Sequence, residues 1–197
     1  AAEEETAQEV ARQNINAFAS GKHDHIVTLC ASCASHLKHN YLKLFALAED
    51  KPAGLKAFTD KIVDFSSFMV DVLKLDGSLF VPRNQKTAYH APCHLCRGLE
   101  IIDAPRNLLK TAGLDYVATR DEDVCCGFGG SYSVDFPEIS AEILKKKLDN
   151  VAAVDPELLV TDCPGCVMQL RGGMDKRGSK IQVKHIAEVL AENKKKP

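Results

Sequence analysis

The spacing of apolar positions in the first third of the chain predicts mainly helices. Residues 3–19 and 54–75 each carry apolar side chains at helical spacing, so we expect an amphipathic helix in both stretches. Between them, residues 25–30 read as a short buried strand that ends at Cys30, and residues 34–50 as a further helix. Residues 76–84 contain the glycine, proline and asparagine that are typical of a linker.

The pattern changes after this linker, because short apolar runs now alternate with helical stretches. The predicted strands cover residues 87–91, 115–119, 157–163 and 181–185. The predicted helices cover residues 103–113, 137–150, 165–174 and 186–193. Such alternation predicts an α/β fold with a largely parallel sheet flanked by helices. Ligand sites in sheets of this kind lie at the carboxyl ends of the strands.

Composition narrows the classes of function. The 197 residues carry a net charge of -2 and their basic residues are spread along the chain, which argues against a nucleic-acid partner. No apolar stretch reaches the roughly 18 residues of a membrane span, and the acidic start "AAEEETAQEV" argues against a secretory signal. We therefore expect a cytoplasmic protein. Eight cysteines in a reducing compartment favour metal binding or catalysis over disulfides.

Five of these cysteines follow predicted strands. Cys93 follows the first strand after the linker, Cys125 and Cys126 follow the second, and Cys163 and Cys166 follow the third. We expect them to meet at one edge of one sheet. Five thiols are one more than a tetrahedral zinc ion takes, whereas an iron–sulfur cluster uses thiolate ligands on several irons. The spacing favours a cluster and leaves zinc as the alternative.

The motifs around these cysteines resemble a known family. The stretches "YHAPCHLCRG", "CCGFGGSYSVDFPEIS", "TDCPGCVMQLRG" and "VKHIAEVL" occur in the order of the cysteine-rich CCG domain. This domain is shared by heterodisulfide reductases, glycolate oxidase iron–sulfur subunits and lactate-utilisation iron–sulfur proteins, and the chain resembles the last two most closely. The resemblance covers roughly residues 85–192.

The resemblance implies a ligand set and a division of the chain. Cys93, Cys125, Cys126, Cys163 and Cys166 would bind a 4Fe-4S type cluster, which is noncubane in the heterodisulfide reductase branch. The stretch "IVTLCASCASHLKHNY" resembles the end of the first repeat of the family and contains Cys30 and Cys33. The rest of that repeat's motif is missing, so no second complete cluster is expected. Cys30 and Cys33 are candidate metal ligands, for example of zinc, and the alternatives are a disulfide or two idle reduced thiols. We therefore expect two CCG-type units, a truncated first unit over residues 1–78 and a complete second unit over residues 79–197.

Other residues near the motifs keep more than one interpretation. Gly127, Gly129 and Gly130 are predicted to wrap the backbone around the cluster and donate amide hydrogen bonds to its sulfur atoms. Cys96 departs from the family pattern and is interpreted as a residue without a ligand role, a substitute ligand, or a partner of the first-repeat cysteines. His90 and His94 flank Cys93 and are either ordinary histidines at a strand end or groups that donate to a sulfur atom or bind the metal.

The resemblance implies an electron-transfer subunit of an oxidoreductase. A flavoprotein dehydrogenase would oxidise a 2-hydroxy acid such as lactate or glycolate, and the cluster would pass the electrons on through other iron–sulfur subunits. Any peripheral membrane association would come through these partners. Two alternatives stay open: thiol or disulfide chemistry at the cluster, as in heterodisulfide reductase, and a structural zinc module.

Overall fold

The described residues form two parallel sheets. A computed structural model describes residues 3–19 and 21–195. In the smaller sheet, β1 (Ile26–Thr28) pairs with β2 (Ile62–Asp64). The larger sheet has the strand order β4-β3-β5-β6 and is parallel throughout. Its strands are β3 (Lys86–Tyr89), β4 (Asp115–Val117), β5 (Leu158–Thr161) and β6 (Gln182–His185).

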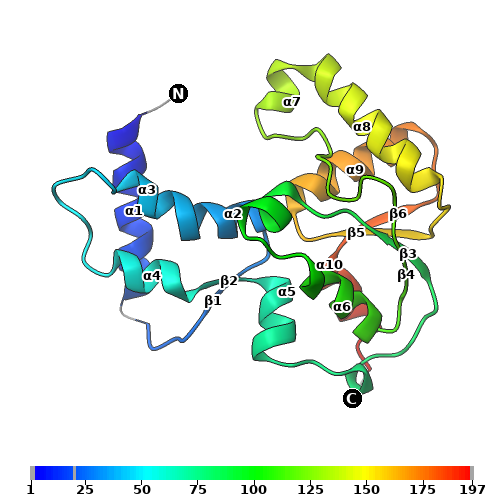
Figure 1. Ribbon diagram of the computed structural model, residues 1–197, viewed down its shortest axis with the longest axis horizontal. Helices are drawn as coiled ribbons and strands as arrows, with labels where there is room; N and C mark the ends of the chain where they lie inside the picture. Colours follow the sequence, from blue (N-terminus) through cyan, green and yellow to red (C-terminus); the bar gives the residue numbers. More distant parts are fainter. Residues whose placement is uncertain (1–2, 20, 196–197) are drawn as a thin grey trace.

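Helices cover both faces of the larger sheet (Figure 1). On one face lie α8 (Pro137–Ala152) and α9 (Pro164–Lys176), and on the other lie α6 (Asp103–Thr111) and α10 (Ile186–Asn193). A short helix, α7 (Tyr132–Asp135), precedes α8. All four residues of β5 are buried because it is a central strand covered on both faces, which explains its continuous apolar sequence. The predicted α/β fold with parallel sheets flanked by helices is confirmed.

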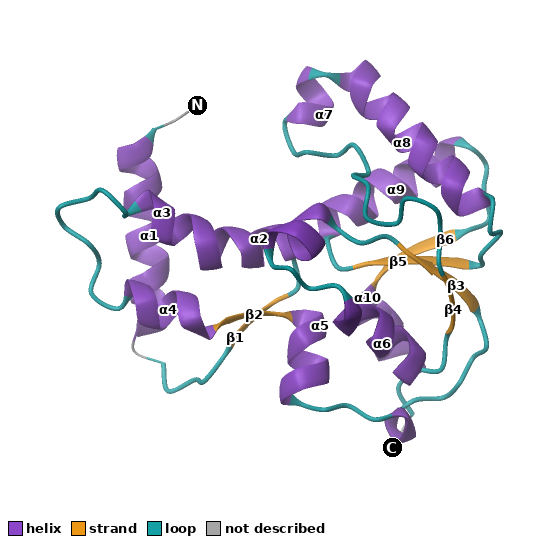
Figure 2. Ribbon diagram, viewed as in Figure 1, coloured by secondary structure: helices purple, strands orange, loops and turns teal. Residues whose placement is uncertain are grey.

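The first part of the chain builds a separate apolar cluster around the smaller sheet (Figure 2). Its helices are α1 (Glu4–Ala19), α2 (Ala31–Ser35), α3 (Tyr41–Leu44) and α4 (Leu55–Lys61). A π-helical turn over His36–Asn40 joins α2 to α3. Its buried side chains include Ile15 of α1, Tyr41 of α3, Phe45 just after α3 and Phe58 of α4.

The single helix predicted over residues 54–75 is wrong. The segment divides into α4, strand β2, the short helix α5 (Phe65–Ser67) and a π-helical turn over Phe68–Val72. β2 forms because Ile62 and Val63 pair with β1, and the side chain of Asp64 then caps α5 by accepting a 3.0 Å hydrogen bond from the Ser67 amide. The apolar residues of this segment are spaced as in one helix, but they belong to two different cores. Those before β2 are buried in the apolar cluster around the smaller sheet, and those after β2 pack against α6 and α10.

The linker segment forms a short 3-10 turn over Gly77–Leu79, after which Phe80 bridges to Lys194 beside the last helix. The two sheets lie on either side of this segment in the sequence. The division into units of residues 1–78 and 79–197 stays a prediction. Within residues 3–19 and 21–195, no helix combines the length and apolar character needed to cross a membrane.

Candidate metal centre

The five cysteines of the second half meet at the carboxyl ends of three neighbouring strands. Cys93 follows β3, Cys125 and Cys126 lie in the loop after β4, and Cys163 follows β5 as the N-cap of α9. Cys166 lies in the first turn of α9. The strand order β4-β3-β5 makes these three loops adjacent. The convergence expected from the sequence is therefore present.

The thiols form a chain of neighbouring groups, in which one pair lies within hydrogen-bond distance. The Sγ atoms of Cys126 and Cys166 are 3.5 Å apart. Cys126 also interacts with Cys125, which interacts in turn with Cys93, and Cys166 interacts with Cys163. Cys126, Cys163 and Cys166 are buried and the other two are half-buried. In the described part of the chain, no disulfide includes any of the cysteines.

Cys30 extends this chain of thiols from the other sheet. Its thiol interacts with that of Cys163, and the backbone N–H of Ala31 donates a 3.1 Å hydrogen bond to the carbonyl of Asp162. Cys30 is the N-cap of α2 with φ -141° and ψ 111°, close to the φ -136° and ψ 117° of Cys163. The two Cys-x-x-Cys turns therefore start alike and meet at their first cysteines.

Cys33 differs, because its side chain is exposed. The strand ends predicted convergence of the five later cysteines only, and the family resemblance added Cys30 and Cys33 as candidate ligands. In the structure Cys30 lies beside Cys163, whereas Cys33 is exposed. The shared sequence pattern Val-Thr-x-Cys-x-x-Cys, at residues 27–33 and 160–166, is a signal that would have identified the two turns as equivalent.

The contacts divide the thiols into two electrostatic classes. Hydrogen bonding from Cys126 lowers the pKa of Cys125, and hydrogen bonding from Cys166 lowers the pKa of Cys163. Acting as a donor to Cys125 raises the pKa of Cys93, and acting as a donor to Cys163 raises the pKa of Cys30. Both hydrogen bonds stabilise the thiolate forms of Cys125 and Cys163, and the thiolate is the form in which cysteine binds metals.

The glycine-rich turn after Cys126 holds the backbone against Cys125. The amide of Gly127 donates a 3.3 Å hydrogen bond to the Sγ of Cys125, and its φ of +89° is one that glycine adopts readily. A Cβ on Gly127 would lie 2.5 Å from the carbonyl oxygen of Ser140, whose hydroxyl donates to the Gly127 carbonyl at 2.8 Å. Gly129 and Gly130 also have positive φ, at +55° and +64°.

A buried lysine supports the loop that carries the Cys-Cys pair. Lys147 of α8 is 2% exposed, and its amine donates to the backbone carbonyls of Asp121 and Glu122, the latter at 3.2 Å. The Glu122 carboxylate forms a 2.6 Å ion pair with Arg106. Burial lowers the pKa of Lys147, while the neighbouring Cys126 thiol opposes this shift. No sequence motif indicates that Lys147 is buried at this site, because it is one of three consecutive lysines at residues 145–147.

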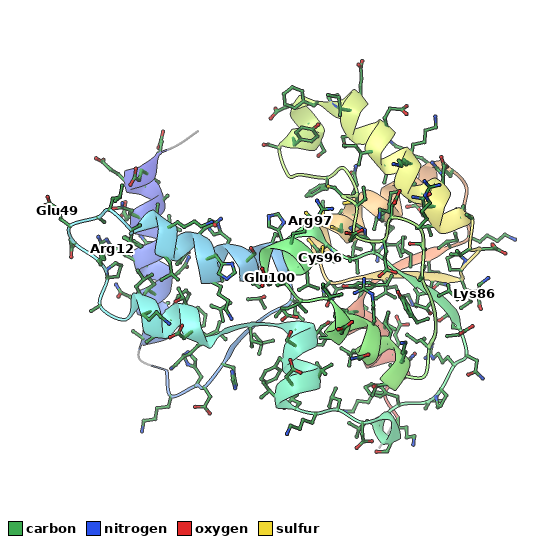
Figure 3. The ribbon with its side chains drawn as sticks, viewed as in Figure 1. Arg12, Glu49, Lys86, Cys96, Arg97 and Glu100 are labelled. Atoms are coloured by element: carbon green, nitrogen blue, oxygen red, sulfur yellow. The ribbon has the colours of Figure 1, made fainter. Side chains whose placement is uncertain are left out.

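The remaining candidates near Cys93 lie in different environments. His90 is buried, and one of its ring nitrogens lies within 4.8 Å of the Sγ atoms of both Cys126 and Cys166. The His94 side chain is exposed, with Nδ1 3.7 Å from the Sγ of Cys93. Cys96 packs against the cluster of α6 and α10, with its Sγ 3.9 Å from the Cys93 carbonyl. Figure 3 shows Cys96 and Arg97 on the segment beside α2.

The donor set fits a metal centre with more than one metal ion. A chain of six neighbouring thiols, two of them stabilised as thiolates, exceeds the four ligands of one tetrahedral ion. Cysteine thiolates are the ligands of iron–sulfur clusters, and amide donors such as Gly127 hydrogen-bond to their sulfur atoms. The site thus has the chemistry to hold such a cluster.

Comparisons with known proteins agree with this description. A family model for the CCG cysteine-rich domain matches residues 1–38 and 87–171. Lactate utilization protein A of Geobacillus sp. strain WCH70 is 36% identical over 186 residues, which are 93% of this chain and 76% of that protein. Lactate utilization protein A of Shouchella clausii strain KSM-K16 is 34% identical over 94% of this chain and 77% of that protein.

The matched segments contain all six cysteines that form the chain of neighbouring thiols. Residues 87–171 include Cys93, Cys125, Cys126, Cys163 and Cys166, and residues 1–38 include Cys30. The family match therefore covers the elements that build the thiol site. On this match and these identities, the chain belongs to the CCG cysteine-rich domain family.

Proposed function

We propose that this chain binds an iron–sulfur cluster and transfers electrons as one subunit of a lactate-oxidising complex. The observation that carries the proposal is the chain of neighbouring thiols at the carboxyl ends of β4, β3 and β5. Cys93, Cys125, Cys126, Cys163 and Cys166 would be the ligands, with Cys30 beside Cys163. When bound, the cluster would supply one-electron transfer.

The residues around the thiols have defined tasks in this proposal. Gly127 donates its amide to the Cys125 sulfur, and Lys147 places a buried positive charge near Cys126. Both interactions stabilise negative charge on the thiolates and so favour the reduced form of a cluster. The burial of Cys126, Cys163 and Cys166 keeps water away from that side of the site.

Lactate is the proposed origin of the electrons because of the relatives. Proteins named lactate utilization protein A are 34–36% identical to this chain over most of its length. The partners would be a flavoprotein that oxidises lactate and other iron–sulfur subunits, in the cytoplasm, with any membrane association made through them. Substrate oxidation itself would take place on the flavoprotein.

The first test is metal analysis after anaerobic purification and reconstitution with iron and sulfide. We expect several irons and a comparable amount of acid-labile sulfide per chain, lost in Cys126→Ser. Cys96→Ser is the matched control, because Cys96 packs toward α6 and α10 instead of joining the thiol chain. Retention of zinc without sulfide, even after reconstitution, would reject the cluster and support a structural zinc site.

The lactate assignment has its own test. A bacterium that lacks its own lactate utilization protein A would be given this chain or the Cys126→Ser variant, with lactate as the only carbon source. We expect growth with the former and none with the latter. Normal iron and sulfide content without growth on lactate would leave the cluster in place and reject lactate as the electron source.

A further inference from the structure

His90 is a buried histidine whose ring nitrogens lack protein partners. It is 1% exposed, and among residues 3–19 and 21–195 neither Nδ1 nor Nε2 has a hydrogen-bond partner. Burying a polar group without a hydrogen bond costs on the order of 1–3 kcal/mol, so buried side chains in native proteins are almost always paired. A ligand at the ring would remove this cost.

The backbone fixes the position of His90 at the end of β3. Its own amide donates a 2.8 Å hydrogen bond to the Val160 carbonyl on β5, and the next amide, that of Ala91, donates a 3.1 Å bond to the Glu122 carbonyl in the loop before the Cys-Cys pair. His90 is therefore tied both to the strand that leads to Cys163 and to the loop that leads to Cys126. The ring lies between these two sources of thiols.

The distances suit one metal ion. A ring nitrogen of His90 and the Sγ atoms of Cys126 and Cys166 all lie within 4.8 Å of one another, and the two Sγ atoms are 3.5 Å apart. A tetrahedral ion with metal–sulfur bonds of about 2.3 Å and metal–nitrogen bonds of about 2.0 Å separates its ligand atoms by about 3.5–3.8 Å. All three groups are buried.

We propose that His90 is a nitrogen ligand of the metal centre and holds one metal ion together with Cys126 and Cys166. The inference deepens the proposed cluster site and rests on metal binding there. It changes the expected centre from all-thiolate to mixed nitrogen and sulfur ligation. Neutral imidazole at an iron gives an iron–sulfur centre a higher reduction potential than thiolate at the same position does, so we expect a higher potential than that of a cluster with a thiolate in place of His90.

The test uses the full chain, with cobalt(II) as the probe of the individual site. Anaerobic titration with cobalt(II) would compare the unmodified protein with His90→Ala and with the control His36→Ala, whose exposed side chain bonds to Asn40 on its own turn. We expect His90→Ala to weaken cobalt binding at least tenfold and to change the visible absorption bands, and His36→Ala to leave both unchanged. Equal affinity and equal spectra in all three proteins would overturn the proposal.

A second measurement does not depend on the folding of a variant. The unmodified chain, labelled with 15N only in histidine and reconstituted with iron and sulfide, would be reduced and examined by pulsed EPR. We expect a strong 15N hyperfine coupling of a directly bound nitrogen. A cluster without this coupling would refute the His90 ligand while leaving the proposed function intact. If cobalt binding depends on His90 but the reconstituted chain retains no sulfide, His90 is a metal ligand and the proposed iron–sulfur cluster is rejected.

Discussion

The hydroxyl of Tyr89 donates a 2.6 Å hydrogen bond to Oδ2 of Asp162, and both side chains are almost fully buried. Tyr89 immediately precedes His90 at the end of β3, and Asp162 immediately precedes Cys163 after β5. The Ser66 hydroxyl of α5 donates to the other carboxylate oxygen. Burial raises the pKa of Asp162 to about 6, against the lowering effect of these two hydrogen bonds. One buried carboxyl group thus joins the two strand ends to the first part of the chain.

Removing the tyrosine hydroxyl tests how strongly this contact supports the fold. Tyr89→Phe takes one donor from a buried carboxylate, so we expect the free energy of unfolding to fall by about 1–3 kcal/mol. Urea denaturation measures the change. Tyr132→Phe, at a half-buried tyrosine on α7, is the matched control and is expected to change stability by about 0.5 kcal/mol at most. Equal stability of the two variants would show that the contact contributes little.

In the turn after the Cys-Cys pair, we expect an alanine to be tolerated better at Gly130 than at Gly127. An alanine at either position would have a strained positive φ. At Gly127 its Cβ would also lie 2.5 Å from the Ser140 carbonyl oxygen, whereas at Gly130 nothing lies within 4 Å of the added Cβ. We expect Gly130→Ala to cost about 1 kcal/mol and Gly127→Ala clearly more, with loss of bound metal. Thermal unfolding and metal analysis of both variants would reveal this difference, and similar values would refute the packing argument.

Lys147 is expected to influence the reduction potential of the centre. Lys147→Met removes a buried positive charge near Cys126, so a bound cluster should become harder to reduce and its potential more negative. Lys146→Met is the control, because Lys146 lies next to it on α8 with an exposed side chain and pairs with Asp121 at 3.6 Å. Redox titration followed by absorption measures both. The prediction fails if the two variants have the same potential.

Cys30 and Cys33 provide a matched pair of substitutions. The Cys30 thiol interacts with Cys163, whereas the Cys33 side chain is exposed. We expect Cys30→Ala to change the absorption spectrum and the reduction potential of the reconstituted protein, and Cys33→Ala to leave both as they are. A change caused by Cys33→Ala alone would mean that the second cysteine of the turn contacts the metal centre, as the family resemblance suggests for both.

Much of the second half of the chain could be predicted from local pattern. Short apolar runs such as residues 158–161 form strands because both faces of a central parallel strand are buried. Three of the four runs in this half are followed by a cysteine, and only the run at residues 182–185 is not. The convergence of Cys93, Cys125 and Cys163 follows from that order in any parallel sheet that places these strands side by side. The same reasoning failed for residues 54–75, because a helical period does not reveal that Ile62 pairs with a strand more than thirty residues earlier.

What the sequence alone determined is therefore the alternation of strands and helices and the placement of cysteines at strand ends, since both depend on neighbouring residues. The tertiary structure decided which groups share the site. The contact of Cys30 with Cys163, the burial of Lys147 and the direction of the His90 ring all depend on segments that are distant in the chain. Their burial follows from the packing of whole elements against one another, and no local spacing encodes it.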